Sequence, residues 1–228
     1  MDARPLPLVY LAREPLMPPA PGHKPPMLLL LHGVGSHERD LFGLASALDP
    51  RFLILSLRAP NVIGPDSYAW FTFTPAPGVN RINANQEEAS RQLLLRVIPE
   101  AVAAYGADPA RVYLMGFSQG AIMSASVTLT RPDLVAGAVL MSGRILPEIK
   151  PLIAPAEALR GLPILVVHGT RDSMLPITHG HASRETLSTL PVALTYREYD
   201  MPHTITDASL ADIAAWLTAR LNEDEPRQ

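Results

Sequence analysis

The chain contains no cysteine and has no excess of basic residues. Without cysteine, disulfide bonds and thiolate zinc sites cannot form, and a cysteine nucleophile is excluded as well. Its 22 acidic and 19 basic residues give a formal net charge of −3, which leaves no basic surface for nucleic acid. We therefore expect chemistry that runs through oxygen or nitrogen atoms, and no nucleic-acid partner.

Long apolar runs are also missing from the N-terminal region. The run from Met27 to Leu31 is far shorter than the roughly 20 residues that a membrane span requires. Pro5, Pro7 and Pro15 interrupt the region where a signal peptide would have its apolar core. We therefore expect no stable membrane insertion and a cytoplasmic protein.

Short apolar runs alternate with helical patterns along the chain. Apolar strands without polar alternation are typical of a sheet covered on both faces, and strands separated by helices require right-handed crossovers. The expected strands are residues 8–11, 27–31, 52–57, 112–115, 135–141, 164–167 and 193–199, and the expected helices are residues 41–48, 87–104, 119–130, 178–190 and 208–221. The pattern predicts an α/β fold with a doubly wound, mostly parallel sheet.

The chain length of 228 residues suits one domain with a large core. We predict a single domain over residues 1–228, with its core at about 27–221. The proline-rich connector 15–26 reads as a loop, because proline fits neither a helix interior nor a central strand. Residues 142–161 are too few for a separate cap domain.

The most informative motif is Gly116-Phe117-Ser118-Gln119-Gly120. It follows the predicted strand 112–115 and opens the predicted helix 119–130. A serine at a sharp strand-to-helix turn needs small residues two positions before and two after it, and glycine occupies both positions. Such a motif also arises by chance in loops, but its place between strand and helix predicts the nucleophile elbow of an α/β-hydrolase, with Ser118 as nucleophile.

A serine nucleophile needs a histidine base, which in turn needs an acid to orient it. In this fold the acid and then the histidine follow the serine along the chain. Asp172 comes after the predicted strand 164–167, and His203 comes after the predicted strand 193–199. Alone, Asp172 could cap a helix and His203 could be solvated. Their order and their shared sheet edge favour a catalytic role for both.

Acyl transfer also requires donors for the oxyanion, supplied in this fold by two backbone amides. Gln119, directly after the serine, supplies the first. His32-Gly33-Val34-Gly35 follows the strand 27–31, and its glycines allow close approach of a substrate. Val34 N–H is therefore the candidate for the second donor, with a plain tight turn as the alternative. We expect His32 to brace this loop.

The remaining polar residues near these motifs are expected to have ordinary roles. His37, Glu38 and Arg39 lie beside the oxyanion loop, and we expect them to be solvated, although they could select a polar leaving group. His179 and His181 are two positions apart, so on a helix they point in different directions, and no carboxylate cluster is nearby. We expect no metal and no cofactor.

An aromatic-rich segment, residues 58–85, shows no clear periodicity. It contains Tyr68, Trp70, Phe71 and Phe73. From the residues alone, an irregular loop that places its rings in the core is the favoured interpretation.

Together these motifs resemble the bacterial phospholipase/carboxylesterase family of α/β-hydrolases, relatives of acyl-protein thioesterases. The resemblance extends from about Met27 to Leu221. The motifs, in family order, are Leu31-His32-Gly33-Val34-Gly35-Ser36, Asp40-Leu41-Phe42, Tyr68-Ala69-Trp70-Phe71, Gly116-Phe117-Ser118-Gln119-Gly120, His168-Gly169-Thr170-Arg171-Asp172 and the late His203. The resemblance implies a Ser118, Asp172, His203 triad with the amides of Val34 and Gln119 as oxyanion hole, and hydrolysis of carboxylic esters without a cofactor.

The resemblance also bears on substrate contacts. It makes Trp70 and Phe71 equally suited to line an acyl pocket or the core, and Leu175 is a third candidate for substrate contact. Pro202 departs from the family, whose members usually have glycine before the histidine; proline removes a backbone donor and stiffens the turn. A fold without a cap favours an open, shallow site for small-molecule esters with short or medium acyl chains.

Several functions remain compatible with these residues. A thioesterase or a lysophospholipase would use the same triad. A binding protein could retain the fold without turnover, since fold does not imply function, although it would have no need to keep nucleophile, acid, base and oxyanion loop together. A homodimer is possible, but no segment requires one.

Overall fold

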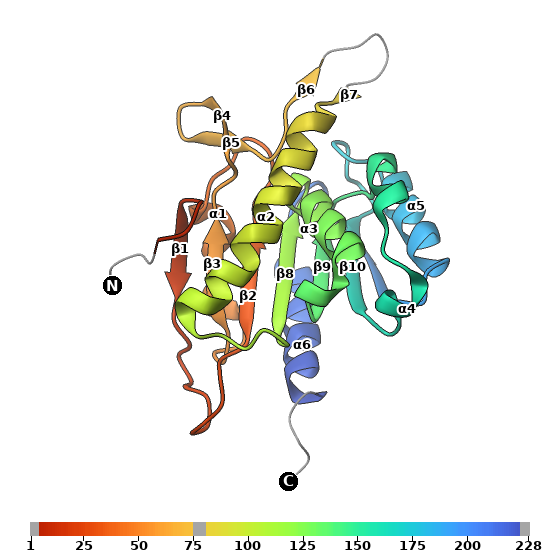
Figure 1. Ribbon diagram of the computed structural model, residues 1–228. Helices are drawn as coiled ribbons and strands as arrows, with labels where there is room; N and C mark the ends of the chain where they lie inside the picture. Colours follow the sequence, from red (N-terminus) through yellow and green to blue (C-terminus); the bar gives the residue numbers. More distant parts are fainter. Residues whose placement is uncertain (1–4, 75–80, 224–228) are drawn as a thin grey trace.

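The computed structural model describes residues 5–74 and 81–223 (Figure 1). A seven-stranded sheet has the order β1-β3-β2-β8-β9-β10-β11. β1 pairs antiparallel with β3, and the other neighbours are parallel. These strands are β1 (Tyr10–Arg13), β2 (Met27–Leu31), β3 (Leu53–Leu57), β8 (Val112–Phe117), β9 (Gly137–Met141), β10 (Pro163–Gly169) and β11 (Ala193–Tyr199). The sheet is the α/β-hydrolase arrangement that the sequence predicts.

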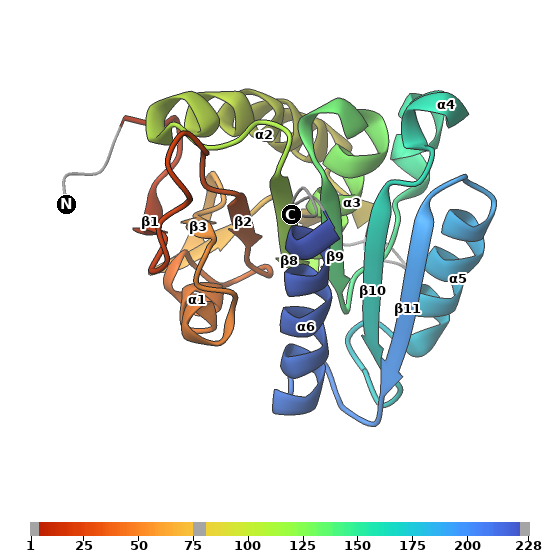
Figure 2. The ribbon, with the colours of Figure 1, turned by 90° about the horizontal axis from the view of Figure 1, so that it is seen from below.

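Helices cover both faces of this sheet (Figure 2). Leu94 of α2, Ile122 of α3 and Leu187 of α5 belong to the core on one face, whereas Leu41 of α1 and Ile213 of α6 belong to the core on the other. The helices are α1 (Arg39–Phe42), α2 (Ala84–Tyr105), α3 (Gln119–Thr130), α4 (Ala156–Leu159), α5 (Ile177–Ser188) and α6 (Asp207–Glu223). Burial on both faces explains why the central strands are uninterrupted apolar runs.

Several predicted segments differ from the structure in their bounds. The predicted helix 41–48 is wrong as one element, because α1 ends at Phe42 with Gly43 as its C-cap and a separate 3₁₀ helix spans Ala45–Ala47. Glycine is a weak helix former, which favours a break at this position. The first strand begins two residues later than predicted, at Tyr10.

The segment predicted as an irregular loop, residues 58–85, contains short strands in its described part. β4 (Asn61–Gly64) and β5 (Ser67–Ala69) form an antiparallel hairpin, and β6 (Phe73–Thr74) pairs with β7 (Arg81–Ile82). The remaining part of that prediction, residues 75–80, lies outside the described residues. Residues 142–161 contain a 3₁₀ helix, Pro147–Leu152, and the four-residue α4, with no separate cap.

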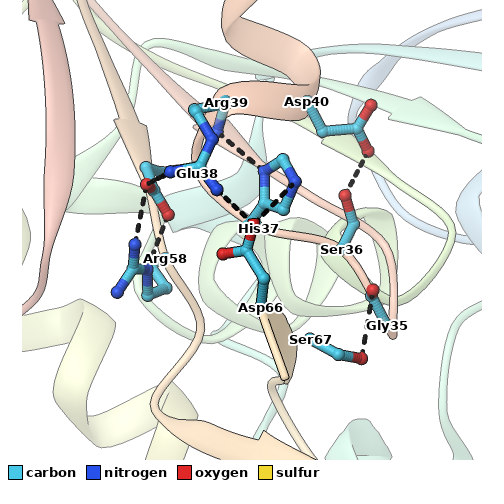
Figure 3. Close-up of polar contacts among 9 residues, drawn as sticks. All are labelled: Gly35, Ser36, His37, Glu38, Arg39, Asp40, Arg58, Asp66 and Ser67. Atoms are coloured by element: carbon cyan, nitrogen blue, oxygen red, sulfur yellow. Dashed lines mark hydrogen bonds and ion pairs between the residues drawn. The ribbon is translucent and has the colours of Figure 1, made fainter. Parts of the chain in front are cut away.

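The hairpin β4–β5 is attached to the loop that follows β2. Gly35 N–H donates to Tyr68 O at 2.8 Å, and Tyr68 N–H donates to Ser36 O at 3.0 Å. Ser67 Oγ donates to Gly35 O at 3.2 Å (Figure 3). The backbone of the loop between β2 and α1 is therefore paired with β5 at Gly35 and Ser36.

A buried carboxylate reinforces this attachment (Figure 3). Glu38 accepts two hydrogen bonds from the guanidinium of Arg58, at 2.6 and 2.8 Å, and Arg58 lies 4.5 Å from the centre of the Tyr68 ring. Arg39 binds both Glu38 and Asp66 in the hairpin turn. Solvation was the wrong expectation for Glu38, which is 3% exposed, because its charge is neutralised by two arginines.

A second close contact fixes α3 on the sheet. A Cβ atom at Gly120 would overlap the carbonyl oxygen of Leu31 in β2, and one at Gly116 would overlap the carbonyl oxygen of Gly120. Both glycines are therefore required by the approach of backbone to backbone. The first turn of α3 rests directly on β2 for this reason.

The carboxylate of Glu38 should contribute pH-dependent stability. Hydrogen bonds from Arg58 lower the pKa of Glu38 to about 2, so its contribution is complete above the unfolded-state pKa near 4.5 and is lost as the pH falls towards 2. We expect Glu38→Gln to lower the free energy of unfolding at pH 7 by about 2–3 kcal/mol, and by less at pH 3. Urea denaturation at both pH values measures this difference.

The control for this experiment is Glu157→Gln. The Glu157 side chain is 83% exposed in its pair with Arg160, so its loss should change the free energy of unfolding by less than about 0.5 kcal/mol. Equal losses for the two variants at pH 7 would contradict the role assigned to Glu38.

The contact of Gly120 predicts a large effect of a single methyl group. Gly120→Ala should cost about 3 kcal/mol or more, because α3 must move away from β2 to admit the side chain. Gly106→Ala is the matched control, since Gly106 has φ +64° with nothing within 4 Å of an added Cβ, and should cost only about 1 kcal/mol. Similar midpoints in urea denaturation would refute the packing argument.

Candidate active site

Ser118 lies in the turn between β8 and α3. Its backbone has φ 54° and ψ −115°, a conformation that is strained for a residue with a Cβ. Ser118 N–H donates to Met141 O at 2.9 Å, and Ser118 O accepts from Ile122 N–H at 3.1 Å. These bonds to β9 and to α3 hold the strained turn in place.

The structure brings the three predicted triad residues together. Ser118 Oγ lies 2.9 Å from His203 Nε2, and His203 Nδ1 lies 2.6 Å from Asp172 Oδ2. Because the carboxylate is an acceptor, Nδ1–H of His203 donates to it, which leaves Nε2 free to accept the serine proton. The Asp172 side chain is fully buried and that of His203 is 17% exposed. Both distances fit a nucleophile and base in direct contact.

The second carboxylate oxygen of Asp172 is held by its own loop. Asp172 Oδ1 accepts from the N–H groups of Met174, at 2.9 Å, and Leu175, at 2.8 Å. Leu175 O in turn accepts from Nε2 of the fully buried His168 at 2.8 Å. His168 therefore holds the loop whose amide groups bind the carboxylate of Asp172.

Sequence reasoning assigned His168 no more than the end of a strand. The only signal for its additional role is a histidine placed four residues before the acid, which a sequence alone cannot distinguish from a buried strand residue. The side chain of Leu175 is half-buried, and its predicted contact with substrate stays a prediction.

The predicted oxyanion loop lies against the elbow. A Cβ atom at Gly33 would be 3.4 Å from Ser118 Cβ, so the backbone before Val34 runs beside the nucleophile. Val34 itself is 42% exposed. Its amide and that of Gln119 stay the predicted oxyanion donors.

His32 braces this loop, as the sequence predicts. His32 Nε2 accepts from Ala59 N–H at 3.0 Å, which requires the proton to be on Nδ1, and Nδ1–H donates to Gly33 O at 2.7 Å. Burial lowers the pKa of His32, so the neutral ring is favoured. The ring thus ties the loop after β2 to the segment that follows β3.

The side chain of Gln119 links the elbow to the aromatic segment. Gln119 Oε1 accepts from Trp70 N–H at 2.7 Å, and Gln119 Nε2 donates to Phe71 O at 2.6 Å. Trp70 Nε1 donates to His32 O at 3.0 Å. Sequence reasoning used only the amide of Gln119 and missed this contact, whose one signal is a glutamine at the start of an apolar helix.

Trp70 and Phe71 were predicted as possible walls of an acyl pocket. Both side chains are fully buried within the core cluster on the α2 and α3 face of the sheet. Their backbone groups are linked to the site by hydrogen bonds with the side chain of Gln119. A direct contact of either ring with substrate stays a prediction.

A cavity of about 230 Å³ adjoins the base. Phe117 and His203 line it, Leu41, Leu44 and Ile205 supply aliphatic side chains, and the lining is completed by Asp40 and Thr204. The rings of Phe117 and His203 are 4.8 Å apart between centroids.

The turn with Pro202 still supplies an acceptor, since Thr204 N–H donates to Pro202 O at 2.8 Å.

Residues 5–74 and 81–223 hold neither a group of metal ligands nor a membrane-spanning helix. Within those ranges no three His, Cys, Asp or Glu side chains are grouped to hold a metal ion. His181 pairs with Glu198 at 2.9 Å, whereas His179 lines a different cavity. No helix in the same ranges is long and apolar enough to cross a membrane.

The chain is similar to known esterases and thioesterases. Acyl-protein thioesterase 1 of Gibberella zeae is 25% identical over 228 aligned residues, covering 91% of this chain and 95% of that protein. Esterase YpfH of Escherichia coli is 26% identical and covers 71% of this chain and 68% of its own length. The crystal structure of esterase PE8 superimposes with a TM-score of 0.78 at 26% identity, over 93% of this chain and 98% of that one.

The family comparison covers most of the chain. The phospholipase/carboxylesterase family matches residues 19–221, a range that includes the elbow, the oxyanion loop, Asp172 and His203. The resemblance expected from the motifs is thereby confirmed. The chain belongs to the phospholipase/carboxylesterase family and is a carboxylesterase-type α/β-hydrolase.

Proposed function

We propose that this protein hydrolyses small-molecule carboxylic esters through an acyl-enzyme intermediate on Ser118. The observation that carries the proposal is the continuous hydrogen-bonded chain from Asp172 through His203 to Ser118 Oγ, at 2.6 and 2.9 Å. A histidine that is already oriented by a buried carboxylate can take the serine proton without rearrangement. Neither a metal nor a cofactor takes part.

The mechanism follows from the placement of these groups. His203 Nε2 accepts the proton of Ser118 as Oγ attacks the ester carbonyl, and then donates it to the leaving alkoxide. The backbone amides of Val34 and Gln119 stabilise the oxyanion. Water, activated by the same histidine, releases the acyl group, while Asp172 holds the ring in the required tautomer.

The size of the cavity beside His203 supports short or medium acyl esters. Its volume of about 230 Å³ is below the range of roughly 300–1,000 Å³ typical of pockets for drug-sized ligands. The side chains of Leu41, Leu44 and Ile205 suit a hydrocarbon group, and Asp40 and Thr204 add polar lining. The proposal places the enzyme in the cytoplasm, without insertion into a membrane.

Thioester hydrolysis is the second candidate. It is favoured by the similarity, over 91% of this chain, to a protein named acyl-protein thioesterase 1. The same triad and oxyanion hole would serve it, as they would serve a lysophospholipase. A non-catalytic binding role is disfavoured, because a binding protein gains nothing from a histidine hydrogen-bonded to both serine and aspartate.

Loss of the nucleophile should abolish turnover and covalent labelling. Ser118→Ala should lower kcat for 4-nitrophenyl butyrate by at least about 10³-fold, and intact-mass analysis should find no fluorophosphonate adduct. Ser188→Ala, which alters an exposed serine at the end of α5, is the control and should keep both. Near wild-type turnover by folded Ser118→Ala would overturn the mechanism.

The substrate preference can be measured with two matched series. We expect kcat/KM for 4-nitrophenyl esters to rise from acetate to a short or medium acyl chain and to fall for longer chains, since the cavity near His203 is small. Matched oxygen esters and thioesters of the preferred acyl group then separate the two candidates. A higher specificity constant for the thioester would give thioester hydrolysis first place.

A further inference from the structure

A second cavity lies between the loop that follows β9 and one face of α5. Its volume is about 220 Å³. From α5 come His179, Ala182, Ser183 and Thr186, whose spacing of three and four residues places them on one face of the helix. From the β9 side come Arg144, Ile145, Pro147 and Lys150.

The lining carries positive charge without a counter-charge. The side chains of Arg144 and Lys150 form no hydrogen bond or ion pair with any residue in the described ranges, whereas Arg58, Arg91 and Arg160 are all paired with glutamate. None of the described lining residues is acidic. Two cationic side chains thus border one cavity, and no described acidic residue lines it.

Ser183 adds an unused donor at the same place. The residue is 4% exposed, and its Oγ has no partner among the described residues. A buried hydroxyl without a hydrogen bond is costly and rare in folded proteins. Since Ser183 lines the cavity, its hydroxyl is a further candidate donor to a ligand there.

His179 completes the set of donors. Burial and the nearby charge of Arg144 lower its pKa, which favours the neutral ring with one N–H donor. Thr186 contributes a further hydroxyl to the lining. The cavity therefore offers donors from two cations, an imidazole and two hydroxyls.

The cavity adjoins the acid side of the triad. Gly143, directly before Arg144, is packed so closely that an added Cβ would be 3.3 Å from Ser118 O and 2.6 Å from the Ala121 side chain. α5 begins two residues after Leu175, whose amide binds Asp172. Both walls of the cavity are thus continuous with loops of the active site.

We propose that this cavity binds an anionic group, a carboxylate or a phosphate. A guanidinium matches the two oxygens of such a group, a lysine adds a point charge, and hydroxyl and imidazole donors complete its coordination. The anion is either a substituent of the ester substrate or a free small anion. The first source rests on the proposed function, and the second does not.

Direct binding tests the site without any turnover. Glutarate and inorganic phosphate are titrated into the protein at low ionic strength in a calorimeter. We expect at least one of these anions to bind saturably. Arg144→Gln should weaken that binding at least tenfold, and Lys150→Gln, at an exposed position, should weaken it severalfold. Arg160→Gln removes the same charge from a pair outside the cavity and should leave the dissociation constant unchanged.

A kinetic comparison distinguishes the two sources. If the substrate carries the anion, mono-4-nitrophenyl glutarate should have a kcat/KM about tenfold above that of its methyl ester, and Arg144→Gln should reduce this ratio towards one. Saturable binding of glutarate or phosphate without such a preference would identify a free anion as the ligand.

Clear outcomes would overturn the proposal. The proposal fails if neither anion binds saturably and the charged ester is not preferred. It also fails if anion binding and ester preference are the same in wild type, Arg144→Gln and Lys150→Gln. Anion binding in a protein that hydrolyses neither ester would instead contradict the proposed esterase function and leave the anion site supported.

Discussion

The close approach of α3 to β2 is the constraint on which the rest of the site depends. Because the carbonyl of Leu31 occupies the space where residue 120 would carry a Cβ, the helix starts directly over the strand. The chain must then turn within one residue, and Ser118 takes the strained conformation. The same contact sets Gln119 against the aromatic segment and Gly33 against the nucleophile.

The base has to cross two strands to reach this serine. β11, which precedes His203, is separated from β8 by β10 and β9. Gly169 at the end of β10 permits the crossing, since a Cβ there would overlap the carbonyl oxygen of Met201. The loop therefore passes closely over β10, beside Asp172, and its histidine reaches acid and nucleophile together. The order of strands and one glycine therefore allow an acid and a base that follow consecutive strands to reach the same serine.

The predictable parts of the structure are those with a local signal. Apolar runs revealed the central strands, and the placement of Ser118, Asp172 and His203 after strands identified the residues that the structure brings together. The contacts of Gln119 and Glu38 had no such signal, because their partners lie 49 and 20 residues away. A glutamate beside a loop reads as solvated until the position of its arginine is known.

The polar groups that support the oxyanion loop differ from those near the acid in how they are satisfied. On the oxyanion side, Glu38, His32 and the Gln119 side chain are each bonded to protein partners, which makes that side a fixed support. On the acid side, Ser183 Oγ and His168 Nδ1 have no partner within the described residues. Since an unpaired buried group costs free energy that a ligand can recover, the proposed anion site lies on the acid side. Under that proposal, support of the nucleophile and recognition of an anion involve different loops of the same sheet edge.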